Sequence, residues 1–330
     1  MRIRYLISTM LSVFLAAGIA AADIESAIER QFAVKDGGLL TIDSDLGSIE
    51  VTAGASDKVV LTVHQTVDAH SPSTADKYLR DLKLDFNQAG NTVTVTARYK
   101  HDSWLKWNQR RIKLRFVAQV PALFNVDLKT AGGSISVADL QGEVISKTSG
   151  GSLKFGQITG PVSGKTSGGS ITLAGCKGNA VLSTSGGSIN VGRVEGEVQA
   201  KTSGGSITIE KSKGSVTAST SGGGIKVEEV YGDIDAATSG GSVSATIQEQ
   251  PAAPCRLSTS GGSVNVTLAP HIKVDVDAST SGGRVRTDFE MSVQGEISRS
   301  HLTGKINGGG PLLRLRTSGG NINIHKTASH

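Results

Sequence analysis

An 18-residue period dominates this chain. The phrase Thr-Ser-Gly-Gly-Ser-Ile, or a close variant, recurs ten times, and the first seven copies follow one another at intervals of 18 residues. A period of this size with one turn phrase per repeat is typical of stacked rungs, in which each repeat buries its apolar side chains against its neighbours. The copies start at Thr130, Thr148, Thr166, Thr184, Thr202, Thr220, Thr238, Thr259, Thr280 and Thr317.

Each repeat contains two short alternating runs. Counted from the threonine as position 1, positions 6, 8 and 15 are apolar and position 17 is small in most repeats. Strict alternation makes these positions and the threonine point inward, and leaves positions 2 and 18 outside. We expect the glycines at positions 3 and 4 to supply positive φ at a tight corner. The sequence predicts an all-β, β-helix-like parallel solenoid over residues 129–330, with two short strands in each 18-residue rung.

The segment that precedes the repeats does not follow the 18-residue pattern. Residues 23–128 contain strand-like runs and one short helical stretch, about Thr74 to Leu82, with Ser73 or Thr74 as the N-cap. The strand-like runs cover about 39–42, 48–52, 59–63, 92–97 and 112–120. An uncovered terminal rung exposes unpaired backbone, so we expect this segment to be a β-rich cap on one end of the solenoid.

The first 22 residues have the pattern of a cleaved secretory signal. Arg2 and Arg4 precede an apolar run from Leu6 to Ala17, and small alanines stand just before Asp23. The apolar run is shorter than the roughly 20 residues that a membrane-spanning helix needs. We expect an exported mature chain that starts near Asp23, has no membrane span, and resides in the periplasm, in the medium or at the cell surface.

The recurring Thr-Ser-Gly-Gly-Ser-Ile phrase resembles that of a known family. Together with the earlier Gly47-Ser48-Ile49-Glu50-Val51 and the Val120-Pro121 before the first repeat, it is similar to the bacterial putative-adhesin family of β-strand-repeat proteins, the DUF4097 domain family. The resemblance covers nearly all of the mature chain. It implies a parallel β-helix-like architecture and an envelope or extracellular location, and it carries no catalytic residues to this sequence. Many members have Asp where this chain has Ser after the glycines.

Position 18, which holds a lysine in several repeats, suggests a ligand-binding face. Parallel stacking places its side chains in one outward column, where like charges roughly 4.8 Å apart repel mildly. This column either keeps an exposed sheet face soluble or, with the neighbouring serines, holds an extended anionic glycan. A weaker candidate is a basic aromatic stretch, Trp104, Trp107, Arg110 and Arg111, which suits sugar stacking or an anchoring role for the cap. The column and its serines are Lys129, Lys147, Lys165, Lys201, Ser149, Ser167, Ser185 and Ser203.

The main alternative is a polysaccharide-active enzyme, a lyase or hydrolase on a β-helix scaffold. Such chemistry needs two or more carboxylates on adjacent rungs. The candidates fall at several repeat positions and on more than one face, with no Arg or His in phase, so we expect no catalytic residues. Calcium in the corners lacks carboxylate ligands, and ice binding would need an external threonine column. The candidate carboxylates are Glu195, Glu197, Glu210, Glu228, Glu229, Asp233 and Asp235.

The remaining features narrow the function further. Cys176 and Cys255 lie four to five rungs apart, about 20 Å, which is too far for a disulfide. The seven histidines show no ligand spacing, and no motif implies a metal or cofactor. A net charge of +5 on an exported chain does not indicate nucleic-acid binding. We expect a non-catalytic binding or structural module, an adhesin whose partner is an anionic polysaccharide or another envelope component. Its oligomeric state stays open.

Overall fold

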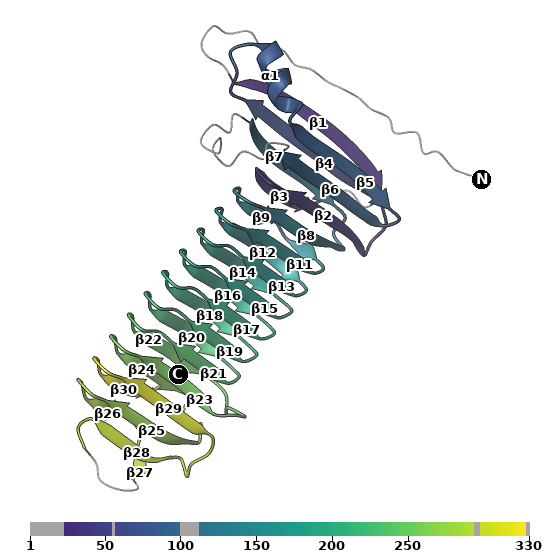
Figure 1. The fold of residues 1–330 in the computed structure, drawn as a ribbon. Coiled ribbons are helices and arrows are strands. Elements are labelled where there is room, and N and C mark those ends of the chain that lie inside the picture. The colour runs from purple at the N-terminus through teal and green to yellow at the C-terminus, as the bar shows by residue number, and fades with distance from the viewer. Residues whose placement is uncertain (1–22, 55–56, 100–111, 294–297, 328–330) are drawn as a thin grey trace. The chain divides into compact units, whose positions relative to one another are not determined.

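The computed structural model describes residues 23–54, 57–99, 112–293 and 298–327. The chain divides into two compact units, Met1–Gly151 and Ser152–His330, which are taken here one at a time. Regular structure in the described ranges is β-strand apart from one helix, so the all-β solenoid prediction is confirmed (Figure 1). The expected leader, residues 1–22, and the Trp104–Arg111 stretch lie outside the described residues. The expected boundary between the cap and the repeats near residue 128 stays a prediction.

The strands of the first unit lie in two sheets. One has the order β1-β4-β7-β3-β9 and the other β5-β6-β2-β8-β11. Pairing is antiparallel at the outer strands and parallel from β7 and β6 inward. All five strand-like runs predicted before the repeats lie within observed strands. The strands are β1 (Ile24–Ala33), β2 (Gly38–Ser44), β3 (Ser48–Ala53), β4 (Lys58–Val67), β5 (Leu82–Ala89), β6 (Thr92–Tyr99), β7 (Ile112–Val120), β8 (Phe124–Thr130), β9 (Ile135–Val137), β10 (Leu140–Gln141) and β11 (Val144–Thr148).

The helix of this unit, α1 (Pro72–Leu79), begins and ends earlier than predicted. Its N-cap is Ser71, whose side chain accepts a hydrogen bond from the backbone N–H of Thr74 at 3.3 Å. Pro72 fits the first turn because the N–H that it lacks would have no helical partner there. The predicted end at Leu82 is wrong, since that residue already begins β5.

The second unit continues the two-sheet pattern with nearly all pairs parallel. One sheet has the order β12-β14-β16-β18-β20-β22-β24-β30-β26, and the other has β13-β15-β17-β19-β21-β23-β29-β25-β28-β27. The strands are β12 (Leu153–Thr159), β13 (Val162–Lys165), β14 (Ile171–Cys176), β15 (Ala180–Ser183), β16 (Ile189–Val194), β17 (Val198–Lys201), β18 (Ile207–Ser212), β19 (Val216–Ser219), β20 (Ile225–Val230), β21 (Ile234–Ala237), β22 (Val243–Ile247), β23 (Cys255–Thr259), β24 (Val264–Leu268), β25 (Val274–Thr280), β26 (Val285–Thr287), β27 (Met291–Val293), β28 (His301–Ile306), β29 (Leu312–Thr317) and β30 (Ile322–Lys326).

Identical repeat positions face each other across the rungs. Ile171, Ile189 and Ile207 stand in one register row, and all three are buried. Val198 at position 15 is 1% exposed, whereas its neighbour Gln199 is exposed. The predicted inward and outward columns are therefore confirmed. The core is a set of aliphatic ladders between two thin sheets.

The threonine at position 1 is buried, as predicted, and its hydroxyl ties neighbouring rungs together. In most rungs it donates to the carbonyl of the position-4 glycine one rung away, as Thr202 does to Gly187 at 2.7 Å. The same oxygen accepts the N–H of the position-4 glycine of its own rung, Gly205, at 3.4 Å. A buried hydroxyl is thus satisfied by corner backbone, and the position-1 threonines do not form an external face that could bind ice.

The corner glycines are needed for a reason other than the predicted one. Among the described glycines, those with φ between +20° and +160° do not include any glycine of a Gly-Gly corner. A Cβ on Gly205 would instead lie 2.2 Å from the carbonyl oxygen of Gly187, and one on Gly151 would lie 2.1 Å from that of Gly133. Position 4 excludes side chains because the backbones of successive corners stack in close contact.

The rungs at the C-terminal end do not stack in chain order. Strand β29 pairs with β23 on one side and β25 on the other, and β30 lies likewise between β24 and β26 (Figure 1). The last rung of the chain therefore lies between the rungs that start at Thr259 and Thr280.

The expectation of parallel pairing throughout the repeats is also wrong here. Strand β28 is antiparallel to both β25 and β27. The interval from Thr280 to Thr317 contains 317 − 280 = 37 residues instead of 18. The extra residues form antiparallel pairs. Antiparallel strands can be joined by a short connection, whereas parallel strands need a long crossover.

Candidate functional site

Three adjacent strands of the second unit present a basic face without acids. The outward side chains of β13, β15 and β17 come from Ser163, Lys165, Val181, Ser183, Gln199 and Lys201, which belong to two register columns. Lys165 and Lys201 are both exposed, with Ser183 between them in the same column. Neither lysine has an ion pair or hydrogen bond to another described residue. We call these six residues the lysine face.

Val181 belongs to this face and was missed by the sequence reasoning. It is 46% exposed and stands between Ser163 and Gln199 in the second outward column. An exposed valine between polar neighbours offers an apolar contact beside the cations, which is the combination that the ring faces of sugars contact. Position 16 points outward in the repeat, so the alternation of the sequence could have indicated that this valine is exposed.

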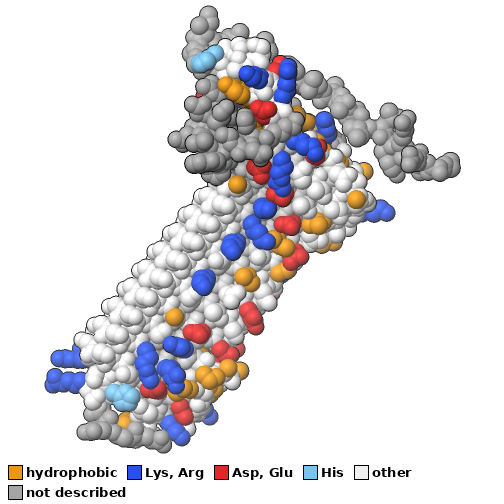
Figure 2. Space-filling model, in the orientation of Figure 1, with side chains coloured by type: hydrophobic (Ala, Val, Ile, Leu, Met, Phe, Trp, Pro, Cys, Tyr) orange, Lys and Arg blue, Asp and Glu red, His pale blue; other side chains and the backbone are white. Residues whose placement is uncertain are grey.

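The serines at position 2 differ from those at position 5. Ser167, Ser185 and Ser203 are exposed, stack in register through their backbones, and leave their hydroxyls free of described partners. At position 5, by contrast, the hydroxyl of Ser170 accepts the backbone N–H of Ser188 at 3.2 Å. The serine that replaces the family's Asp therefore has a structural role, while the position-2 serines are open to a ligand. Figure 2 shows a broad band free of charged and apolar side chains along one flank of the second unit.

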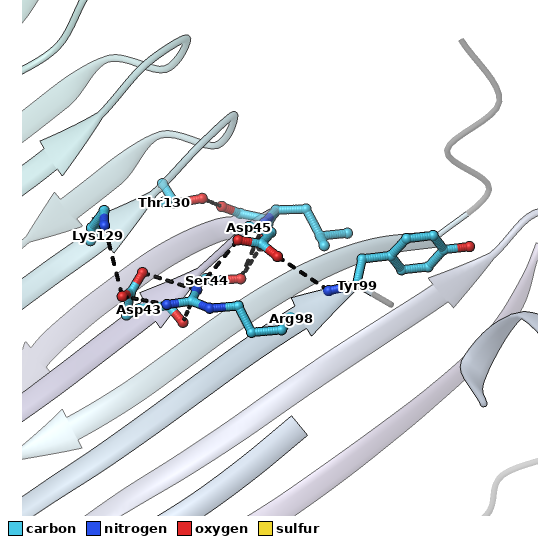
Figure 3. A network of polar contacts seen from close by, with 9 residues as sticks. Asp43, Ser44, Asp45, Arg98, Tyr99, Lys129 and Thr130 are labelled. Atoms are coloured by element: carbon cyan, nitrogen blue, oxygen red, sulfur yellow. Dashed lines mark hydrogen bonds and ion pairs between the residues drawn. The ribbon is translucent and has the colours of Figure 1, made fainter. Parts of the chain in front are cut away.

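In the first unit, the equivalent lysines have different surroundings. Lys147 and Lys129 face each other across β11 and β8 in parallel register, and both are exposed. Lys147 has no ion-pair partner among the described residues. Lys129 lies 3.8 Å from a carboxylate oxygen of Asp43 on β2, which also binds the guanidinium of Arg98 on β6 (Figure 3). Ser149 is exposed in the adjoining corner.

The Asp43 network neutralises Lys129. Hydrogen bonds from Arg98 hold the pKa of the Asp43 carboxyl below its ordinary value, so this group stays ionised beside the lysine. Asp45 completes the cluster, because it accepts the backbone N–H of Tyr99 at 3.2 Å and lies 3.4 Å from Arg98 (Figure 3). Lys129 is thus a member of a structural ion-pair network, and the free lysines of the predicted set are Lys147, Lys165 and Lys201.

The candidate carboxylates are more clustered than the sequence reasoning expected. Four of them line one open groove of about 360 Å³ at the C-terminal ends of β16, β18 and β20. Arg193, Lys211 and Lys213 line the same groove. Arg193 reaches these carboxylates from a different repeat position than that of Glu210, its ion-pair partner, so a search for residues in the same phase did not find it. Glu197, Asp233 and Asp235 lie elsewhere. The four groove carboxylates are Glu195, Glu210, Glu228 and Glu229.

Each groove carboxylate has a cationic partner. Arg193 lies 2.9 Å from Glu210, Lys211 2.9 Å from Glu229 and Lys213 3.7 Å from Glu195. The fourth, Glu228, lies 2.7 Å from Lys226.

The hydrogen bonds of the Lys211 ammonium to Tyr231 and Glu229 raise its pKa, and the same contact with Lys211 lowers the pKa of Glu229. A general acid needs a raised carboxyl pKa, which Glu229 does not have. Three of the four groove carboxylates are ion-paired across adjacent rungs, and Glu228 is paired within its own strand.

Both cysteines are buried and unpaired, at 4% and 2% exposure for Cys176 and Cys255. Burial raises the pKa of each thiol to about 11. Cys255, which follows the prolines at 251 and 254 in the sequence, is the first residue of β23 and its side chain lies in the core. The part of the chain that the structure describes contains no group of three or more metal-ligating side chains. Over the same residues, no helix is long and apolar enough to cross a membrane.

The model of the Toastrack DUF4097 family matches residues 39–325. The chain belongs to this family. The resemblance inferred from the Thr-Ser-Gly-Gly-Ser-Ile phrase is thereby confirmed. No protein of curated function matches the chain.

Solved structures that match the chain share little sequence with it. A putative adhesin from Bacteroides fragilis is 13% identical over 92% of this chain and 97% of its own, with a TM-score of 0.30. A putative lipid binding protein from Parabacteroides distasonis is 12% identical over 90% and 96%, with a TM-score of 0.37. A putative cell adhesion protein from Clostridium sporogenes is 10% identical over 92% and 100%, with a TM-score of 0.22.

Proposed function

We propose that the protein is an exported, non-catalytic binding module that holds an extended anionic polysaccharide on its lysine face. The observation that carries this proposal is the charge balance of β13, β15 and β17. Their outward side chains include two exposed lysines without partners and no carboxylate. The cations around Lys129 and in the groove, by contrast, are ion-paired. Unpaired cations on a flat sheet favour a polyanionic partner.

The spacing of the face suits a polymer. Lys165 and Lys201 are two rungs apart, or about 9.6 Å at ~4.8 Å per rung. That separation is close to the length of a disaccharide unit, so alternating acidic sugars would meet successive lysines. Free hydroxyls at Ser167, Ser185 and Ser203 stand beside the column and can bond sugar hydroxyls. Lys147 and Ser149 offer the same chemistry on the first unit.

A role as an adhesin of the cell envelope follows from this binding and from the leader-like residues 1–22. The enzymatic alternative is less well supported, because its best carboxylates are all ion-paired and the pKa of Glu229 is lowered. The basic aromatic stretch Trp104–Arg111 remains a second candidate contact for the same ligand class.

A pair of charge-matched variants tests the proposal. The double variant Lys165→Glu, Lys201→Glu reverses the charge of the lysine face. The double variant Lys154→Glu, Lys177→Glu makes the same change in net charge at exposed positions outside that face. Binding to an acidic polysaccharide such as alginate is measured at low and moderate salt.

We expect the face variant to lose at least tenfold in affinity and the control variant to lose no more than about twofold. Wild-type binding should weaken with salt, because screening acts on exposed charges. Equal losses in both variants would show that only net charge matters. Absence of binding by the wild type would reject the proposal.

A further inference from the structure

Three arginines gather on the outward face of the sheet that also carries the lysine face, beginning three strands beyond β17. Arg256 on β23 and Arg314 on β29 occupy paired register positions, and Arg316 follows two residues along β29. Figure 2 shows Lys and Arg side chains crowded on the face drawn, near the end of this unit where β25 and β28 lie. We call these three residues the arginine cluster.

The cluster exists because of the order of the rungs. Arg256, Asp277 and Arg314 each stand three residues before the threonine of their rung. Had the rungs stacked in chain order, Arg256 would face Asp277 and the two charges would compensate each other. Instead β29 inserts between β23 and β25, so Arg256 faces Arg314 and Asp277 lies on the far side. The insertion exchanges an opposite-charge neighbour for a like-charge neighbour, which destabilises a sheet.

Asp277 compensates only one side of the cluster. It accepts a hydrogen bond from the Arg316 guanidinium and lies 3.7 Å from Nε of Arg314. A second Arg316 nitrogen donates to the Asp277 backbone carbonyl at 2.8 Å, which fixes that guanidinium in place. Two guanidiniums therefore share one carboxylate.

Arg256 forms no close ion pair in the part of the chain that the structure describes. It is exposed, and among the described residues nothing forms an ion pair or hydrogen bond with its side chain. Its other register neighbour is Asp235, and the two side chains are not within ion-pairing distance. On the other side its register neighbour is Arg314, which shares the carboxylate of Asp277 with Arg316.

We propose that the arginine cluster binds a multi-oxygen anion, a sulfate or phosphate group, between the guanidiniums of Arg256 and Arg314. Such a group accepts several hydrogen bonds at once, which matches two planar forks on adjacent strands about 4.8 Å apart. Arg316, held by Asp277, supplies a fixed third positive charge. The anion is either a free ion or an ester substituent on a polymer. This site shares no residue with the lysine face, so its ability to bind an anion does not depend on the proposed function of that face.

The test uses the full chain and titration calorimetry. The probes are inorganic sulfate, inorganic phosphate, dextran sulfate and uncharged dextran. Arg256→Gln removes the charge, and Arg256→Lys keeps the charge but loses the planar fork. The matched control is Arg193→Gln, an exposed arginine of the same unit that is paired with Glu210.

We expect both Arg256 variants to weaken anion binding about tenfold or more, since charge-assisted bidentate bonds are lost. The control should stay within about twofold of the wild type. Much tighter binding of dextran sulfate than of sulfate, with the same dependence on Arg256, identifies a polymer-borne ester. Equal affinity per sulfate group identifies a free ion. Wild-type affinity in Arg256→Lys, equal losses in Arg256→Gln and the control, or no binding of any probe would overturn the proposal.

Discussion

Substitution of one corner glycine tests how the stack is built. Gly205 is the fourth residue of its rung, and its φ lies outside the left-handed region, so an alanine is permitted by its torsion angles. A Cβ at this position would lie 2.2 Å from the carbonyl oxygen and 2.5 Å from the carbonyl carbon of Gly187. Both contacts are with backbone, which cannot rotate away. Gly205→Ala therefore forces the two corners apart.

The cost follows from the displacement. Contacts of real Cβ atoms essentially never fall below 3.0 Å, so the corner must move by at least 3.0 − 2.2 = 0.8 Å. The bonds across this corner include Gly204 N–H to Ser185 at 2.9 Å and the Thr202 hydroxyl to Gly187 at 2.7 Å. Stretching both costs about 1 kcal/mol each, and overpacking adds about 1–3 kcal/mol. We expect a destabilisation of about 3–5 kcal/mol, summed from these values.

Hydrogen exchange measured by mass spectrometry localises the effect, because long repeat arrays need not unfold in two states. Protection should fall in the rungs on either side of Gly205. The control is Ser203→Ala, an exposed corner position that should leave protection and melting temperature unchanged. If the two variants show the same protection, close stacking is not what requires glycine at position 4.

Three further predictions follow from burial. Val198→Asp should lower the melting temperature far more than Gln199→Asp, because a buried unpaired carboxylate costs several kcal/mol; equal melting temperatures would refute the inward assignment. Ser146→Ala should be neutral or stabilise by up to about 1 kcal/mol, since its hydroxyl is buried without a partner, and a clear loss in denaturant titration would contradict this. Cys176 and Cys255, whose pKa burial raises to about 11, should resist alkylation at neutral pH and both react after denaturation without reductant; a disulfide found by mass spectrometry would contradict this.

The repeat alone was sufficient to predict the solenoid and its inward columns. Alternation is a local property, and each rung meets the same environment, so Ile189 and Val198 are buried for the reason that the sequence suggests. The reason for the corner glycines was not accessible, because it is a contact between rungs and not a torsion angle.

Charge partners were harder to predict than burial. The groove ion pair of Arg193 and Glu210 joins different repeat positions on adjacent rungs, so a search for residues in the same phase missed it. Lys129 looked equivalent to Lys165, yet Asp43 from outside the repeats compensates it. The position of Arg314 beside Arg256 depends on the insertion of the last rung, which no periodicity encodes.

The most direct test of the proposed function is a footprint of lysine reactivity. The protein is treated with an amine-acylating reagent with and without alginate, and modified sites are quantified by mass spectrometry. Lys165 and Lys201 should be protected by the polymer, while Lys154 and Lys177, which are also exposed but lie outside the lysine face, should react as before. Protection of all four to the same degree, or of Lys154 and Lys177 alone, would contradict binding on the lysine face.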